Sequence, residues 1–231
     1  MKILLVNKFY FTENRSGGVG TYVFGLQKIL EKKGHEIIPW GVNEKETIKN
    51  PYLEYFLSPV ETGKTKNIFK ILKTLGRFFW SFEARCKLKK ILKKEKIDIV
   101  HLNNIYHQMS PSFLPILKKK GIPVVMTVHD YNLVCPNYNL CMDGKEYKRA
   151  IGKKYWQCLS DKCVENSFGK SLVLVLKMYF HNKFLKIYQK NIDIFIAPSD
   201  FVRQKLLKAG FPEKKIQVLS HFVDMDLSVE K

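Results

Sequence analysis

The strongest constraint on the fold is a repeated alternation of short apolar runs with longer segments of helical periodicity. The short runs are apolar at nearly every position, which is typical of strands buried on both faces of a sheet. The expected strands are Lys2–Val6, His35–Trp40, Ile97–His101, Ile122–Val128, Ile192–Ala197 and Ile216–Leu219. The expected helices are Gly18–Lys33, Lys66–Glu95, Ser110–Lys120, Ser167–Lys190 and Ser199–Ala209. This order predicts an α/β fold with a Rossmann-like parallel sheet and helices on both faces.

Two finer expectations concern the segment between the second and third strands. A short strand is expected near Leu53–Leu57, within a polar stretch that contains proline. The long helix that follows is expected to break at Gly76, because glycine disfavours the helical conformation.

Chain length and hydropathy allow one large domain and argue against a membrane-spanning protein. Hydrophobic residues make up 45% of the 231 residues, enough for a substantial core. The longest apolar run, Leu172–Leu176, ends at Lys177 and is far shorter than the roughly 18 to 20 residues that cross a bilayer. Met1–Val6 lacks the basic leader and cleavage site of a signal peptide. This, together with an odd count of five cysteines, favours a reducing, cytoplasmic location.

The formal net charge of +19 is concentrated in one segment. Many of the lysines lie between Lys64 and Lys96, in a stretch that also carries the aromatic residues Phe69, Phe78, Phe79, Trp80 and Phe82. One interpretation is a solvated helix face. Another is a helix that lies on anionic lipid, which would hold the protein peripherally on the inner face of the membrane. Nucleic acid is not expected as a partner, because the sequence has no basic recognition-helix motif and no zinc-finger spacing.

Polar residues follow the carboxyl ends of several expected strands, where open α/β sheets bind their ligands. They are Asn7, Asn103, Asn104, His129, Asp130, Ser199 and His221, with His101 at the end of its strand. Each has a simple structural alternative: Ser199, for example, is a good helix N-cap, and asparagines are common in turns. Because the carboxyl ends of parallel strands meet at one edge, their convergence predicts a binding site there.

A glycine-rich stretch, Gly17-Gly18 with Gly20, opens the first expected helix. It is not a dinucleotide-binding fingerprint, because about ten residues separate it from the first strand and Val23 stands where the third glycine belongs. A helix N-terminus with glycines still allows close approach of an anion such as a diphosphate. The alternative is a plain flexible loop that ends in a helix cap.

Residues 131–167 form an insertion that carries four cysteines, Cys135, Cys141, Cys158 and Cys163, with the spacing C-x5-C-x16-C-x4-C. Two close pairs separated by a spacer could form a structural tetrathiolate zinc site, although the first pair is wider than usual. Buried free thiols and redox or disulfide chemistry are the alternatives. Cys86, on the basic helix, is expected to be unrelated.

Four segments together resemble a known family. They are the first 37 residues, which begin KILLVNKFYF after Met1 and end in GHEI, then DIVHLNN, VVMTVHDY, and the segment from IAPSDF to SHFVD. The chain resembles the N-terminal domain of family 4 (group 1) glycosyltransferases, which have the GT-B fold. The resemblance implies two Rossmann-like domains with a cleft between them, the N-terminal domain holding the acceptor and the C-terminal domain the nucleotide sugar. Residues 1–231 would then be a single acceptor-side domain, with the nucleotide-sugar domain absent.

The resemblance also assigns roles to single residues. Gly17 and Gly18 match a loop near the donor diphosphate, and His129 matches a histidine that reaches the reacting sugar. A hydrogen bond from a neutral imidazole suits that role, although a structural histidine is the alternative. Asn103, Asn104, Asp130 and Ser199 are expected to bind donor or acceptor. One departure is His221-Phe222-Val223-Asp224, where the family often has N-G-V-D.

The resemblance implies a retaining, hexosyltransferase-type enzyme. It would transfer a sugar from a nucleotide sugar to a glycan or lipid-linked acceptor, in cell-surface polysaccharide or glycolipid synthesis. No cofactor is expected for catalysis, and the chain alone is expected to be inactive. The alternatives are a non-catalytic module that pairs with a separately encoded C-terminal domain, and a basic protein that only reuses the fold to bind nucleic acid or lipid.

Overall fold

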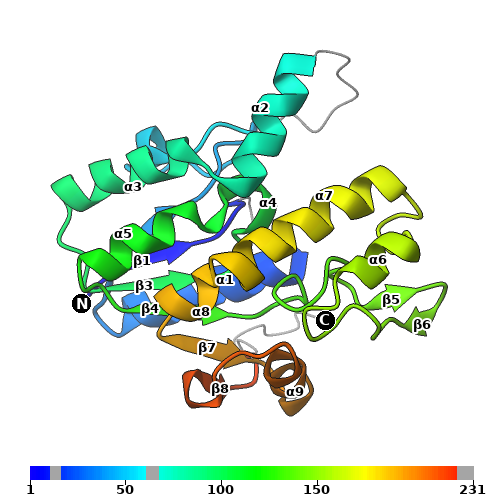
Figure 1. The fold of residues 1–231 in the computed structure, drawn as a ribbon. Helices are drawn as coiled ribbons and strands as arrows, with labels where there is room; N and C mark the ends of the chain where they lie inside the picture. Colours follow the sequence, from blue (N-terminus) through cyan, green and yellow to red (C-terminus); the bar gives the residue numbers. More distant parts are fainter. Residues whose placement is uncertain (11–16, 61–67, 223–231) are drawn as a thin grey trace, which may run out of the picture.

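The computed structural model describes residues 1–10, 17–60 and 68–222. Its centre is a sheet of six parallel strands in the order β2-β1-β3-β4-β7-β8, flanked by helices (Figure 1). The strands are β1 (Lys2–Val6), β2 (Glu36–Trp40), β3 (Ile99–Leu102), β4 (Val124–Thr127), β7 (Ile194–Ala197) and β8 (Ile216–Val218). Each lies within one of the apolar runs or differs from it by a single residue. The predicted Rossmann-like α/β fold is therefore confirmed.

The sheet forms the core because its apolar runs are covered by helices. In β1, Leu4, Leu5 and Val6 are completely buried. Helix α1 (Gly17–Lys32) connects β1 to β2, and Gly34, with φ +77°, follows its end in the left-handed conformation that glycine adopts readily. Between β3 and β4 the chain forms α4 (Tyr106–Met109), a 3-10 turn (Pro111–Phe113) and α5 (Leu114–Lys119). Between β7 and β8 it forms α9 (Asp200–Lys208) and a second 3-10 turn (Glu213–Lys215).

The basic helix is two helices, and the predicted break at Gly76 is wrong. Helix α2 (Ile68–Phe79) runs through Gly76, and α3 (Phe82–Lys94) begins after Ser81. Ser81 is extended, and its hydroxyl accepts a hydrogen bond from the amide of Ala84, which caps α3. Ser112 Oγ accepts from Ser81 N at 3.1 Å, so a distant contact fixes the break. The start of the predicted helix, residues 66–67, lies outside the described residues.

Two other segments differ from the expected pattern. Leu53–Tyr55 is a 3-10 turn, and only an isolated parallel bridge, Val42 to Leu57, remains of the expected strand there. The predicted helix 167–190 is divided into α7 (Phe168–Met178), a π-helical turn (Tyr179–Phe184) and α8 (Ile187–Asn191). Lys186, with φ +49°, interrupts it.

The insertion at residues 131–167 has regular structure of its own. It contains a short hairpin, β5 (Cys141–Met142) with β6 (Lys145–Glu146), and helix α6 (Trp156–Ser160) beside α7 (Figure 1). Its apolar residues join the main core: Leu133, Val134, Leu140, Tyr147, Ala150, Ile151 and Tyr155 are all buried. The insertion is therefore packed against the domain and is not a free loop.

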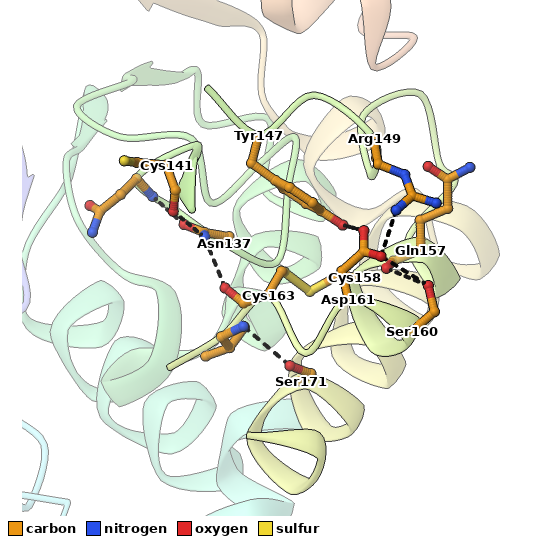
Figure 2. The surroundings of a disulfide bond; sticks show 12 residues. Asn137, Cys141, Tyr147, Arg149, Gln157, Cys158, Ser160, Asp161, Cys163 and Ser171 are labelled. Atoms are coloured by element: carbon orange, nitrogen blue, oxygen red, sulfur yellow. Dashed lines mark hydrogen bonds and ion pairs between the residues drawn. A yellow bond between two sulfur atoms is a disulfide. The ribbon is translucent and has the colours of Figure 1, made fainter. Parts of the chain in front are cut away.

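The four cysteines of the insertion do not form the zinc site that their spacing suggested. Cys158 and Cys163 form a disulfide at the end of α6, with their Cα atoms 4.9 Å apart (Figure 2). Cys135 is a buried free thiol and Cys141 an exposed one. A disulfide leaves neither sulfur available as a thiolate ligand. No group of three His, Cys, Asp or Glu residues within the described part of the chain could hold a metal.

One face of the sheet is incompletely covered. The row Leu102, Met126 and Phe195 is completely buried across three neighbouring strands. The adjacent row, which points to the other face, is only partly covered, and in it Ile194 is 39% exposed. Within the described ranges, no helix has the length and apolar character needed to cross a membrane.

Candidate functional site

The site lies at the carboxyl ends of β1, β3 and β4. The chain runs from β1 to the neighbour on one side, β2, and later enters β3 on the other side. Such a change of direction opens a crevice at the carboxyl edge of a doubly wound sheet, which is where these folds bind ligands. Asn7 follows β1, Asn103 follows β3, and His129 follows β4 with one residue between.

Asparagines join the ends of β1 and β3. Asn7 Oδ1 accepts a hydrogen bond from Asn104 N at 3.2 Å, and Asn104 O accepts from Lys8 N at 2.7 Å. Asn103 Nδ2 donates to Val6 O at 3.3 Å. All three asparagines are buried, so these bonds hold the strand ends in fixed register.

Asn103 also fixes the ring of His129. Its amide nitrogen donates to Val6 O, so its oxygen faces His129 Nε2, 2.9 Å away, and must accept. His129 therefore carries its proton on Nε2, and Nδ1 is left as a hydrogen-bond acceptor. Burial, with the nearby His221 and His101, lowers the pKa of His129 to about 3, so the ring is neutral. A neutral imidazole with one acceptor nitrogen can bind a hydroxyl group.

Aromatic side chains surround His129. The Tyr22 ring, from α1, meets it edge-on at 4.9 Å, and His221 stacks on it at 5.0 Å. Tyr22 also contacts Phe222, whose ring lies against Gly25 on the same helix, 3.0 Å from where a Cβ would be. Any side chain at position 25 would displace Phe222. The segment His221-Phe222 is thus packed onto α1 beside His129.

A second group of polar residues, here called the Lys177 cluster, adjoins His129. It consists of Lys8, His107, Asp130, Asn132 and Lys177. Lys177, on α7, is only 3% exposed, and its Nζ lies 3.2 Å from both His107 Nδ1 and Asn132 Oδ1. Asn132 Nδ2 lies 3.4 Å from His107 Nε2.

Lys177 Nζ and Asn132 Nδ2 lie against opposite ring nitrogens of His107. The ring nitrogen that carries the proton therefore depends on the charge of Lys177, because an ammonium donates to Nδ1 whereas a neutral amine can accept from it. Burial lowers the pKa of Lys177 to about 7, although Asp130 acts to raise it. The charge of Lys177 lowers the pKa of His107 to about 2, with burial as a further cause.

Asp130 links the cluster to His129, its neighbour in the chain. It is half-buried, and its Oδ1 accepts a hydrogen bond from Asn132 N at 2.9 Å. Burial raises the pKa of its carboxyl group, while the Asn132 amide, Lys8 and Lys177 act to lower it.

The remaining residues predicted for the site are placed less centrally. Gly17 and Gly18 are exposed at the start of α1, and a Cβ on either would meet nothing within 4 Å. Ser199 is exposed and caps α9, its hydroxyl accepting from Val202 N. The structure therefore brings Asn103, Asn104, His129 and Asp130 together and gives Ser199 a structural task.

Sequence reasoning missed Lys8, His107, Asn132 and Lys177 as site residues. For Lys177 a signal was available, because it stands directly after the apolar run Leu172–Leu176 in a helix that packs on the core. A lysine at such a position is rarely buried without a role.

A separate hollow lies beside the basic segment. It is a pocket of about 650 Å³ lined by Ser58, Pro59, Val60, Thr74, Gly76, Arg77, Trp80, Ser81, Phe82 and Glu83. Phe82 is 73% exposed at its edge. Arg77 pairs with Glu83 at 3.3 Å and donates to Gln108 O.

Comparison with known proteins yields one family and a set of similar folds. A family model described as Glycosyltransferase Family 4 matches residues 16–227. An uncharacterized 42.6 kDa protein in the cps region of Klebsiella pneumoniae is 29% identical over 224 residues, covering 91% of this chain and 52% of the relative. The chain thus spans about half the length of this curated relative.

Among solved structures, the catalytic domain of starch synthase IV from Arabidopsis thaliana, bound to ADP and acarbose, has a TM-score of 0.52 at 14% identity. The match covers 98% of this chain and 52% of that one. A UDP-N-acetylglucosamine 2-epimerase from Rickettsia bellii has a TM-score of 0.48 at 14% identity, covering 96% of this chain and 45% of that one. The starch synthase likeness supports a shared fold.

Proposed function

Because this chain belongs to glycosyltransferase family 4, we propose that it is the acceptor-side half of a retaining hexosyltransferase. The reaction would move a sugar from a nucleotide sugar to a glycan or lipid-linked acceptor. The observation that carries the proposal is the neutral imidazole of His129, held by Asn103 at the carboxyl edge of the sheet.

His129 suits the reacting sugar because its free Nδ1 accepts a hydrogen bond and needs no change of charge. A sugar that loses its leaving group develops positive charge at the anomeric carbon, and its hydroxyl groups become more acidic. A hydrogen bond from such a hydroxyl to Nδ1 is then stronger in the transition state than in the ground state, which accelerates the reaction. The rings of Tyr22 and His221 would keep the histidine in position.

The donor is proposed to be a nucleotide sugar. The starch synthase domain of similar fold was solved with ADP, which supports a nucleoside diphosphate as the carrier. Gly17 and Gly18 would lie near the diphosphate, since they begin α1 and leave open space for it. No cofactor is proposed for the transfer step.

The second half of the enzyme is proposed to come from protein outside this chain. The match to 52% of the Klebsiella relative supports a second part of similar size. Turnover would require both, because the groups that stabilise the leaving diphosphate would lie on the second half.

The setting is proposed to be synthesis of a cell-surface polysaccharide or glycolipid, at the cytoplasmic face of the membrane. The relative in a cps region supports the first point. For the second, α3 carries the exposed lysines Lys89, Lys90 and Lys93 and the exposed ring of Phe82, a combination that suits anionic lipid.

The experiment combines the chain with the part of the Klebsiella relative that it does not match and supplies a panel of UDP- and ADP-sugars with lipid-linked acceptors. Mass spectrometry should detect an acceptor one hexose heavier, and ¹H NMR should find the anomeric configuration of the donor kept in the product. An inverted product would reject the retaining mechanism. No transfer with any donor would reject the proposed function for this pair.

A further inference from the structure

Lys177 is buried at a place where its own helix gives no reason for a lysine. It is 3% exposed and follows the apolar run Leu172–Leu176, and both of its described hydrogen bonds go to neutral groups, His107 and Asn132. Burying an amine without a paired charge lowers stability, because the group loses its hydration. Such groups are candidates for binding or catalysis when they adjoin a cleft.

The Lys177 cluster does adjoin the site. Asp130 is the residue after His129, and Lys8 N donates to Asn104 O next to Asn103. Lys8, His107 and Asp130 are half-buried and can meet a solute, whereas Lys177 and Asn132 are buried behind them. The cluster therefore shares the hydrogen-bonded framework that holds His129.

Amines outnumber carboxylates in the cluster. Lys8 and Lys177 supply two amines, His107 is neutral, and Asp130 is the single carboxylate among the five residues. We infer that the Lys177 cluster binds an anionic group, a carboxylate or a phosphate, on the acceptor molecule. That the ligand is an acceptor rests on the proposed function; that the cluster takes an anion rests on the cluster alone.

Binding should follow the protonation of the groups that face the cluster. These are Lys8, Tyr106, His107, Asp130, Lys177, His181 and Tyr188. An anion favours the ammonium form of Lys177, whose pKa in the free protein is about 7, so binding takes up a proton near neutral pH. Burial lowers the pKa of Lys8 and raises the pKa of Asp130, so neither shift opposes the effect of Lys177. The two histidines stay neutral and the tyrosines keep their protons, so affinity should fall as pH rises above 7.

The test measures binding to the 231-residue chain by isothermal titration calorimetry with three probes. Glucuronate offers a carboxylate, glucose 6-phosphate a phosphate, and glucose neither. At least one acidic probe should bind 10-fold or more tightly than glucose and weaken from pH 7 to pH 9. Binding of whichever acidic probe is preferred also identifies the anion. Equal affinity for all three probes, or saturable binding of none, would overturn the inference.

Three variants test whether the acidic probe binds at the Lys177 cluster. Lys177→Met keeps most of the length of the side chain and removes the amine, so it should lose at least 10-fold of the affinity for the acidic probe, as should Lys8→Met at the half-buried side. Lys119→Met, on the exposed end of α5, is the control and should bind as the wild type does. The thermal midpoint of each variant, measured on the same sample, checks that a loss of affinity occurs in folded protein. Wild-type affinity in Lys177→Met would contradict the assignment.

Two further experiments distinguish an acceptor anion from the donor diphosphate, and the anion site from the proposed function. UDP added in excess should leave the acidic probe bound; displacement by UDP would assign the cluster to the donor diphosphate and overturn the acceptor assignment. If the completed enzyme transfers to a neutral acceptor with Lys177→Met fully active, the inference fails and the proposed function stands. If acidic probes bind as described but no transfer occurs, the anion site stands and the proposed function fails.

Discussion

At the scale of single residues, the site consists of polar side chains whose protonation is fixed by their neighbours. Asn103 holds His129 as a neutral ring with its proton on Nε2. His107 lies between Asn132 and Lys177, with one ring nitrogen against each. In both places an asparagine amide contacts Nε2 of a histidine. The two histidines are therefore prepared for hydrogen bonding at neutral pH and not for carrying charge.

The residue on which catalysis should depend most is His129. In the enzyme completed by its second half, His129→Ala should lower kcat by about 10- to 1000-fold, which corresponds to about 1.4 to 4 kcal/mol of lost transition-state stabilisation. Its loss leaves Asn103 Oδ1 without this partner, so the free energy of unfolding should fall by only about 1 kcal/mol.

The check is kcat and thermal midpoint on the same sample, with His35→Ala as the control, since His35 precedes the amino end of β2 at the opposite edge of the sheet. Unchanged kcat in a folded His129→Ala enzyme would remove His129 from the site. A loss of activity that only follows the unfolded fraction would make it a structural residue.

The sequence located His129, Asp130, Asn103 and Asn104 because each follows an apolar strand, and a parallel sheet brings such positions to one edge. It could not locate Lys177 in the same way. Lys177 reaches the site from the middle of a crossover helix, and its burial depends on how α7 packs over the sheet. Local pattern says little about such packing. His107 was missed for a related reason: it lies on α4, a four-residue helix too short to show periodicity.

At the scale of elements, strands were predictable and helix breaks were not. A buried parallel strand can be predicted from its own run of apolar residues. The break between α2 and α3 instead depends on hydrogen bonds between Ser81 and Ser112, which is distant in the sequence. Gly76 looked like the weaker point, yet glycine costs only about 1 kcal/mol inside a helix. A Cβ at Gly76 would meet nothing within 4 Å, so no close packing forces the helix to break there. Lys186 similarly interrupts a helical pattern that its sequence would allow to continue.

The cap at Ser81 can be tested directly. Ser81→Ala removes the acceptor for Ala84 N in a residue that is only 2% exposed, so the free energy of unfolding should fall by about 1 to 2 kcal/mol. Urea denaturation followed by circular dichroism measures the change. Ser160→Ala, at an exposed serine bonded only within its own turn, should change stability by less than about 0.5 kcal/mol. Equal effects of the two would show that the cap does not hold the break.

The disulfide should stabilise the insertion modestly. Cys158 and Cys163 are five positions apart, and a loop this short restricts the unfolded chain by about 2 kcal/mol. The double variant Cys158→Ala with Cys163→Ala should therefore unfold at a lower midpoint, and a reductant should lower the wild type in the same way but not the variant. Cys86→Ala, an exposed thiol on α3, is the control. Loss of stability on adding a zinc chelator without reductant would instead revive a metal site in the insertion.

At the scale of the whole molecule, one surface combines features that suit lipid. The α2–α3 region presents lysines and aromatic rings around a pocket lined by Trp80 and Phe82. The proposed association with a membrane would use this surface.

The lipid surface makes a measurable prediction. Sedimentation with vesicles should show binding to those with anionic lipid and little to neutral ones, because each lysine near an anionic surface contributes about 1 kcal/mol. Replacing Lys89, Lys90 and Lys93 of α3 by glutamine should weaken the binding by at least 10-fold. Replacing Lys119, Lys120 and Lys190 by glutamine removes the same charge from exposed positions elsewhere and should weaken it less. Equal losses in both sets would indicate attraction by net charge alone.

The most direct test of the account is sugar transfer by the purified chain, alone and together with a second half. The 231-residue chain should form no product with any nucleotide sugar, and steady turnover should appear once the proposed second half is supplied. His129→Ala should lower this turnover by about 10- to 1000-fold, as expected for the loss of one positioned contact. Robust turnover by the chain alone would contradict the central claim that it is one half of the enzyme.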